Sequence, residues 1–207
     1  MLYIAENLKK YRKQKNLTQE DVAELLLISP QSVSKWERGE SYPDIAFLPA
    51  LANLFETSID ALIGMDAIRA EETRYNIHKN ANEQQRAGDY RAAAAIYRDA
   101  LRTYPNDVGY MLGLADTLAL SGDSEEAILL TERGLALSKN EKQRASSRAV
   151  LCFLYLKAGK TDKANALAAT LPHTRESREV IQPLIAGGLA ENEIDKNLRY
   201  VILGERE

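Results

Sequence analysis

Near its amino end the chain carries apolar residues that are spaced as on one face of a helix. The first clear stripe consists of Val22, Ala23, Leu25 and Leu26. It follows Thr18, a residue type that favours the N-cap position, and Asp21 falls in the first turn, where an acidic side chain is favourable. These residues predict a short helix over 18–26.

A second short helix is predicted directly after a tight turn. Ser29 suits its N-cap, and Pro30 suits its first position, where a missing N–H costs nothing. Val33 and Trp36 are three residues apart, so they share a face that should anchor the helix to a core. Gly39 suits the position that ends it. Two short helices with a polar second helix have the form of a DNA-reading helix-turn-helix.

An ordered series of segments extends this pattern: Leu17–Gln19, Ala23, Ser29–Gly39, Pro43–Ile45, Leu48–Phe55 and Ser58–Gly64. The series resembles the Xre/Cro-like regulators of bacteria and phages over roughly residues 4–64. The resemblance implies an all-α, lambda-repressor-like DNA-binding domain of five helices. We expect these helices near 4–14, 18–26, 29–38, 44–55 and 58–63.

The resemblance also implies which side chains meet DNA. Gln19 and Arg38 would hold phosphates. The residues facing the major groove would be Pro30, Gln31, Ser32 and Lys35. A glutamine amide can bind adenine through two hydrogen bonds, and lysine can reach guanine O6 or N7. Ser29 joins the set because a helix N-terminus presents free N–H groups to a phosphate, and Thr18 is included at the start of the preceding helix. The alternative is that these side chains form only a solvated helix face.

Two positions depart from the family pattern. Many relatives have glycine or another residue tolerant of a left-handed backbone where this chain has Leu27. If that position needs a positive φ, leucine costs on the order of 1 kcal/mol, unless the turn differs or packing offsets the strain. Pro30 brings no hydrogen-bonding side chain to the groove. Specificity should therefore depend on Gln31 and Lys35.

Charge in the first 64 residues neither proves nor refutes DNA binding. Seven Lys and Arg stand against nine Asp and Glu, a net charge of −2, which is unusual for a domain that meets phosphates. The positive residues are clustered, however: Lys9, Lys10, Arg12, Lys13 and Lys15. Local charge matters most because the Debye length is about 8 Å, although the cluster can equally be an ordinary solvated helix end. We expect one domain to bind DNA modestly and a dimer to be needed.

The second half of the chain contains a repeat that begins after a polar stretch, 66–73, which reads as a linker or a continuing helix. One kind of turn occurs three times: Ala87–Tyr90, Ser121–Ser124 and Ala158–Thr161. The central glycines are 34 and then 37 residues apart. Each permits the left-handed residue that ends a helix. A small residue follows each glycine by five positions, where helices must approach closely: Ala93, Ala127 and Ala164.

This pattern predicts helical hairpins and resembles the tetratricopeptide repeat. The first unit matches best, through Gly88, Tyr90, Ala93, Tyr97, Ala100 and Pro105. The units are expected at roughly 74–107, 108–141 and 145–173, with capping segments near 174–186 and 189–203. We therefore predict a helix-turn-helix domain over 1–65, a linker over 66–73, and a short α-solenoid with C-terminal capping helices over 74–207.

The composition of the chain bears on which classes of protein and which kinds of site can be excluded. Of the 207 residues, 45% are hydrophobic and 28% charged, and the net charge is −3, which is typical of globular folds. No apolar run approaches the ~18 residues of a membrane span, and Met1–Ile4 leads straight into a helix, so we expect no signal peptide and a cytoplasmic protein. The single cysteine, Cys152, is expected to be a buried small hydrophobe. His78 and His173 are not part of any metal-ligand spacing. We expect no catalytic residue, metal or cofactor, and no enzyme.

The leading hypothesis is a sequence-specific transcriptional regulator, a homodimer on a palindromic operator of double-stranded DNA. The repeat domain would mediate self-association or receive a signal. One alternative is a peptide-responsive regulator whose solenoid binds a signalling peptide, because the architecture looks like the peptide-pheromone receptors of Gram-positive bacteria. A second alternative is a protein-interaction adaptor without DNA binding.

Overall fold

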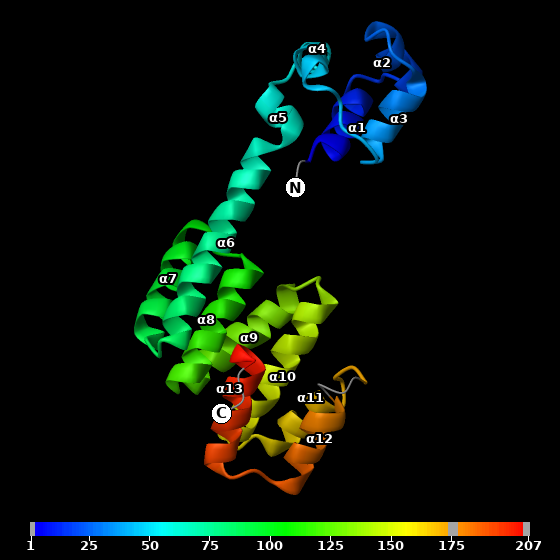
Figure 1. The fold of residues 1–207 in the computed structure, drawn as a ribbon. Helices are drawn as coiled ribbons and strands as arrows, with labels where there is room; N and C mark the ends of the chain where they lie inside the picture. Colours follow the sequence, from blue (N-terminus) through cyan, green and yellow to red (C-terminus); the bar gives the residue numbers. More distant parts are fainter. Residues whose placement is uncertain (1–2, 174–177, 205–207) are drawn as a thin grey trace. The chain divides into compact units, whose positions relative to one another are not determined.

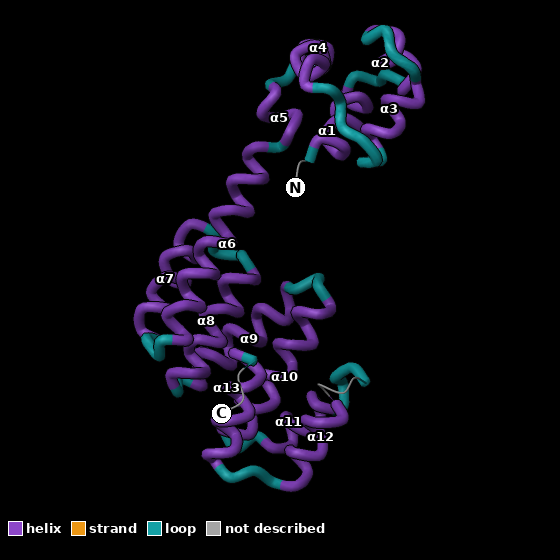
Figure 2. The backbone as a smooth tube through the Cα atoms, viewed as in Figure 1, coloured by secondary structure: helices purple, strands orange, loops and turns teal. Residues whose placement is uncertain are grey.

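The computed structural model describes residues 3–173 and 178–204 (Figure 1). Within these ranges every regular element is a helix and no strand occurs (Figure 2). The chain divides into two compact units, Met1–Tyr75 and Asn76–Glu207. The prediction of an all-α fold is confirmed.

The N-terminal unit contains the expected helices: α1 (Ile4–Gln14), α2 (Gln19–Leu25), α3 (Pro30–Glu37), α4 (Leu48–Leu54) and α5 (Ile59–Ile63). The segment expected as one helix over 44–55 begins as a 3₁₀ turn, η1 (Ile45–Phe47), before α4. Hydrophobic side chains from all five helices form the core of this unit: Ile4, Leu8, Val22, Ala23, Val33, Trp36, Leu51, Ala52, Phe55 and Leu62. Leu25 departs from its predicted stripe, since 59% of it is exposed.

The helix starts follow from local capping. The Thr18 hydroxyl accepts a hydrogen bond from the Asp21 N–H at 3.1 Å, while the Thr18 N–H donates to the Asp21 carboxylate at 2.7 Å. Ser58 caps α5 by accepting from the Ala61 N–H at 3.0 Å. Such caps satisfy backbone donors that a helix leaves free at its start. The short helices are therefore encoded by neighbouring residues.

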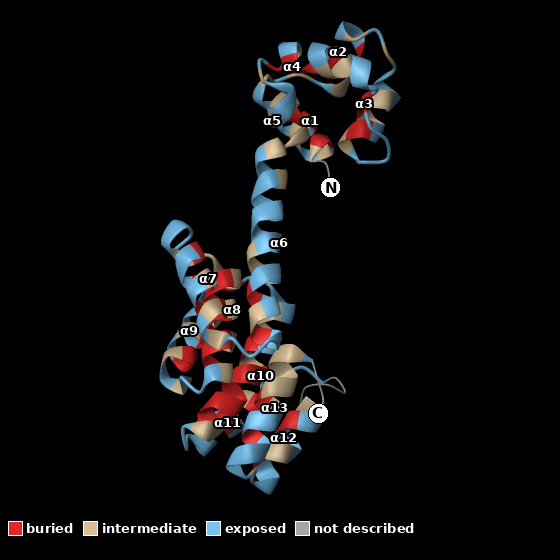
Figure 3. Ribbon diagram, turned by 60° about the vertical axis from the view of Figure 1, so that its left-hand side comes forward, coloured by how far each residue is buried: buried red, intermediate tan, exposed pale blue. Residues whose placement is uncertain are grey.

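Helix α6 (Met65–Arg86) includes residues 66–73, so the segment predicted as a linker is helical. Between Asp66 and Asn76 its residues are exposed except for Ile68, which is intermediate (Figure 3). The domain boundaries at 65 and 74 stay a prediction.

The second unit is a stack of helical hairpins. Three pairs follow one another: α6 with α7 (Tyr90–Thr103), α8 (Val108–Ser121) with α9 (Ser124–Leu137), and α10 (Glu141–Lys157) with α11 (Thr161–Ala168). The turn glycines Gly88, Gly122 and Gly159 have φ values of +78°, +91° and +69°. Ala93, Ala127 and Ala164 are fully buried. The predicted turns and close helix contacts are thus confirmed.

Two further helices complete this unit, α12 (Arg178–Gly187) and α13 (Glu191–Leu203). Helix α12 packs on α11, whereas α13 packs on α10 and α8 (Figure 1). The capping segment expected near 174–186 is seen from Arg178 on, and residues 174–177 lie outside the described residues. Buried positions are concentrated along α8 and α10 (Figure 3).

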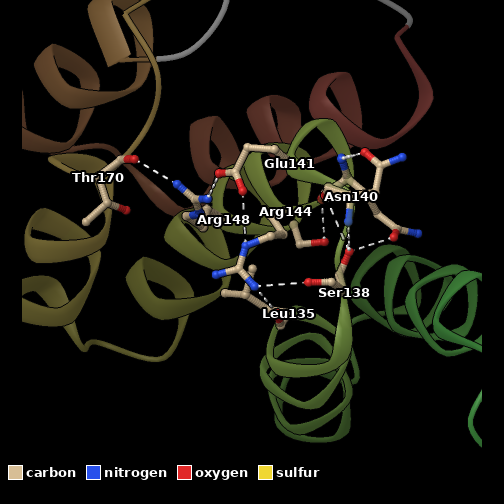
Figure 4. A network of polar contacts seen from close by, with 9 residues as sticks. Leu135, Ser138, Asn140, Glu141, Arg144, Arg148 and Thr170 are labelled. Atoms are coloured by element: carbon tan, nitrogen blue, oxygen red, sulfur yellow. Dashed lines mark hydrogen bonds and ion pairs between the residues drawn. The ribbon is translucent and has the colours of Figure 1, made fainter.

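Polar contacts fix the junction between α9 and α10 (Figure 4). One guanidinium nitrogen of Arg144 donates to the carbonyl oxygens of Leu135 and Ser138, at 2.8 and 3.1 Å. The carbonyls at the end of a helix lack intrahelical donors, so a cation there is favourable. Arg148 donates to the Thr170 carbonyl at 2.8 Å and pairs with Glu141. These contacts hold α10 against the end of α9 and the loop after α11.

Candidate DNA-binding interface

The rotation of α3 is set by its buried face. Val33 and Trp36 are 3% and 6% exposed, and the Trp36 ring lies 5.8 Å from that of Phe47 between centroids. With this face turned inward, positions 31 and 35 and the capping residue Arg38, spaced four and three residues apart, lie on the opposite side of the helix. Gln31, Lys35 and Arg38 are all exposed. The structure thus brings three of the predicted DNA-contacting residues onto one accessible face.

The start of α3 offers fewer free donors than a helix usually does. Ser29 accepts a hydrogen bond from the Ser32 N–H at 3.2 Å, and the two hydroxyl oxygens lie 2.9 Å apart. Pro30 has no N–H. Of the N–H groups that the start of a helix leaves free, those of Ser29 and Gln31 have no acceptor among the described residues and can meet a phosphate.

The side chains of Gln31 and Lys35 are exposed, and among the described residues no hydrogen-bond or ion-pair partner is found for either. Neither side chain gives up an intramolecular hydrogen bond or ion pair when it binds a base edge, although Lys35 is near enough to Glu40 to help lower the pKa of that carboxyl. Glutamine and lysine are also residue types that read adenine and guanine in the major groove. Their role in DNA binding stays a prediction.

A buried ion pair ties α3 to α1. The Arg12 Nε donates to Glu37 Oε1 at 2.5 Å, and a second Arg12 nitrogen donates to Glu37 Oε2 at 2.9 Å. The Arg12 side chain is 13% exposed and that of Glu37 is 4% exposed. The remaining guanidinium nitrogen donates to the Leu17 carbonyl at 2.8 Å. This two-bond geometry orients the end of α3 against α1.

The same carboxylate also holds α2. The Gln19 amide nitrogen donates to Glu37 Oε2 at 2.8 Å. Burial by itself would raise the pKa of Glu37, but the hydrogen bonds from Arg12 and Gln19 outweigh it and lower that pKa below its ordinary value. Glu37 is therefore an anion on which α1, α2 and α3 converge, a role that no local pattern around it in the sequence indicates.

The residues predicted to hold phosphates have intramolecular partners. Gln19 is engaged with Glu37, although its amide carries a second hydrogen. Arg38 forms a two-bond pair with Glu40, at 2.6 and 2.9 Å, and the two side chains are 54% and 51% exposed. Exposed pairs of this kind are weak, so a DNA phosphate can replace Glu40 at low cost. Phosphate binding by Gln19 and Arg38 stays a prediction.

The basic cluster predicted on α1 is divided by the fold. Arg12 is paired with Glu37, and the Lys15 ammonium lies 2.6 Å from a Glu56 carboxylate oxygen. The members that remain exposed are Lys9, Lys10 and Lys13. The positive charge that α1 can offer to DNA is smaller than the sequence indicates.

Leu27 sits in the left-handed region of the backbone, with φ at +56°. The Ile28 N–H donates to the Ala23 carbonyl and the Leu27 N–H to that of Glu24, the paired bonds that end a helix at such a residue. The leucine side chain is 92% exposed. The strain expected at Leu27 is therefore present, and packing does not offset it.

Replacing this leucine tests the strain. Leu27→Gly should stabilise the N-terminal unit by about 0.5–1 kcal/mol, because glycine adopts positive φ without the steric cost. Leu27→Ala is the matched control, since it removes the same exposed side chain but keeps the Cβ, and it should change stability little. Urea unfolding followed by the fluorescence of Trp36 measures both. Equal stability of the glycine and alanine variants would show that the turn is not strained.

Other chemistry is sparse in the described residues. Among them, no three His, Cys, Asp or Glu side chains are grouped so as to hold a metal ion. Cys152 is buried, and burial raises the pKa of its thiol to about 12, so the thiol is un-ionised near neutral pH. None of the described helices combines the length and the apolar character that a bilayer crossing needs.

Comparison with known proteins gives two family matches. Residues 8–62 match the family described as helix-turn-helix, and residues 78–142 match the family described as tetratricopeptide repeat. The HTH-type transcriptional activator BcrR of Enterococcus faecalis is 32% identical over 167 residues, which cover 74% of this chain and 80% of that protein.

Further relatives match shorter stretches of the chain. The uncharacterized HTH-type transcriptional regulator YqaE of Bacillus subtilis (strain 168) is 41% identical over 59 residues, covering 28% of this chain and 51% of that protein. The HTH-type transcriptional regulator ImmR of the same strain is 32% identical over 80 residues, which cover 39% of this chain and 63% of that protein. Among solved structures, Bacillus thuringiensis PlcR in complex with the peptide PapR7 and DNA covers 96% of this chain and 70% of its own, at 16% identity and a TM-score of 0.45.

Proposed function

The chain belongs to the helix-turn-helix family of transcriptional regulators, and we propose that it reads a specific DNA sequence through the exposed face of α3. The observation that carries this proposal is the placement of Gln31 and Lys35 opposite the buried Val33 and Trp36. In this position both side chains can enter a major groove while the core holds the helix. Arg38 and Gln19 are proposed to contact the flanking phosphates.

We propose further that the active form is a homodimer on a palindromic operator. The first 64 residues have a net charge of −2, and two of the five basic residues on or next to α1 are bound to carboxylates. A single unit therefore gains little electrostatic affinity for DNA. Two linked units that bind half-sites one helical turn apart gain affinity without new contacts. The repeat unit is proposed to hold the copies together or to receive a signal.

The proposed partners are double-stranded DNA and a second copy of the chain. We place the protein in the cytoplasm, where bacterial DNA lies, and propose that it acts by binding and not by catalysis. The family of its relatives supports this assignment.

Selection of bound sequences from a random DNA pool tests the proposed function. The full chain should enrich a palindrome whose half-sites are about 10 base pairs apart. The double variant Gln31→Ala, Lys35→Ala should lose this enrichment, because each good base contact contributes about 1–3 kcal/mol of discrimination.

Lys79→Ala is a matched control, since it removes one exposed positive charge from the repeat unit. It should enrich the same palindrome as the unaltered chain. If the double variant enriched the same motif as the unaltered chain, the proposal that α3 reads the DNA would be contradicted. No enrichment by any of the proteins would contradict DNA reading and favour the adaptor hypothesis.

A further inference from the structure

A cavity of about 290 Å³ lies in the repeat unit between the first helices of the three hairpins. Helix α6 contributes His78, Asn82 and Gln85, α8 contributes Asp116, and α10 contributes Gln143 and Ser146. The residues on each helix recur at spacings of three or four, so each helix turns one face to the cavity. The apolar part of the cavity wall includes Leu112, Val150 and Ile202.

Several polar groups of the cavity wall are satisfied within the protein. The Tyr97 hydroxyl lies 3.1 Å from the Nδ1 atom of His78. The Gln85 amide donates to the Thr117 hydroxyl at 2.6 Å, and Gln143 accepts from the Ser138 hydroxyl at 2.8 Å. These polar side chains are thus held in place by contacts within the protein.

Asp116 differs from these neighbours in the contacts of its side chain. Among the described residues, no hydrogen bond or ion pair is found for its carboxylate, although the side chain is half-buried and lines the cavity. Burial raises the pKa of Asp116 to about 7. The described wall of the cavity contains no Lys or Arg. A desolvated carboxylate is unfavourable as an anion unless a positive charge meets it, so Asp116 is the group of this cavity that a bound cation would stabilise most.

The size and lining of the cavity limit what that cation can be. A volume of about 290 Å³ is at the small end of ligand pockets. It suits one charged group with a short chain rather than a whole peptide. An ammonium group can meet the carboxylate, and Leu112, Val150 and Ile202 can pack against the attached carbons.

We propose that this cavity binds a primary ammonium group, with Asp116 as its counter-ion and the apolar wall as the contact for the attached chain. The same chemistry is present in a small aliphatic diamine and at the amino end of a short peptide. The site is separate from α3, and its occupancy does not depend on whether the chain binds DNA.

Isothermal titration of the full chain with 1,4-diaminobutane, and separately with trialanine, tests the proposal. At least one of them should bind saturably, and the one that binds identifies the source of the amine. Asp116→Asn should weaken binding about tenfold or more, because the ammonium group loses its counter-charge and keeps only a weaker hydrogen bond to a neutral amide oxygen. Acetylation of every amine of the ligand should have the same effect.

Glu83→Gln is the matched control, because it removes the same charge from an exposed position on α6. It should leave affinity unchanged. Saturable binding that Asp116→Asn leaves intact, or no saturable binding of either ligand, would overturn the proposal. Neither outcome bears on the DNA-binding function, which is measured separately.

The pH dependence gives an independent readout. The ammonium group needs the ionised carboxylate, so affinity for 1,4-diaminobutane, whose amines stay protonated over this range, should rise about tenfold between pH 6 and pH 8. The other titratable groups at the cavity are His78 from α6 and Tyr97 from α7, while the lining residues of α10 and α13 are uncharged. His78→Gln should therefore keep the rise, and Asp116→Asn should abolish it. A rise that persists in Asp116→Asn would contradict the assigned counter-ion.

Discussion

Glu37→Gln is expected to destabilise the N-terminal unit by about 3–5 kcal/mol, because it leaves the Arg12 guanidinium buried without its counter-charge. The side chain of Glu37 is 4% exposed and that of Arg12 is 13% exposed, so water cannot replace the lost carboxylate. The hydrogen bond from Gln19 would be weakened as well. A loss of this size is a large fraction of the stability of a small unit.

The chain carries its own probe for this measurement. Trp36 is its only tryptophan and lies in the core of the N-terminal unit, so its fluorescence during urea unfolding follows that unit. Glu40→Gln is the control, because the Arg38–Glu40 pair is about half exposed, is screened by solvent and should contribute little to stability. Equal, small effects of the two substitutions would contradict the role assigned to Glu37.

The same pair predicts an acid dependence. The pKa of Glu37 is lowered in the folded state, so its contribution to stability is present above the pKa of the unfolded chain. That contribution is lost as the pH falls through the lower, folded-state pKa. The stability difference between the unaltered chain and Glu37→Gln should therefore shrink on acidification below pH 4.

Asp116→Asn is expected to stabilise the repeat unit at pH 8 by on the order of 2–4 kcal/mol. Burial raises the pKa of this carboxyl from 3.8 to about 7, so the folded state binds more protons than the unfolded state between these values. Stability therefore falls as the pH rises through that range. Asparagine removes the penalty, and below pH 4 the substitution should have little effect.

Cys152 offers a probe for the repeat unit, because it is the only cysteine and is fully buried there. At pH 8, its labelling by a thiol reagent should become slower in Asp116→Asn, since labelling requires the unit to open. Thermal unfolding followed by far-UV circular dichroism extends the comparison to pH 4. Asp99→Asn, on an exposed side chain, is the control and should change neither measurement. Destabilisation by Asp116→Asn at pH 8 would show that the carboxylate has a stabilising partner.

The elements of the fold are encoded locally, and for that reason the sequence predicts them well. Ser29, Val33, Trp36 and Gly39 fix the start, the buried face and the end of α3 by their spacing alone. The repeat turns are equally local, since a glycine and the alanine five residues later identify each hairpin.

The parts that the sequence does not predict depend on how helices cross. Arg12 and Glu37 are 25 residues apart, and their pairing follows from the packing of α1 against α3. Arg12 therefore looks like one more member of a basic cluster. Asp116 likewise looks like an ordinary polar residue of α8, and it becomes a cavity carboxylate only when α6, α8 and α10 stack.

Base discrimination by single variants tests the central claim, that the exposed face of α3 reads DNA, most directly. The affinities of the unaltered chain, Gln31→Ala and Lys35→Ala would be measured on the selected site and on versions with each base pair changed in turn. We predict that each variant loses about 1–3 kcal/mol of discrimination at one or two base pairs of the half-site and keeps it elsewhere. Full discrimination by both variants, or an equal loss of affinity for every sequence, would contradict reading by α3.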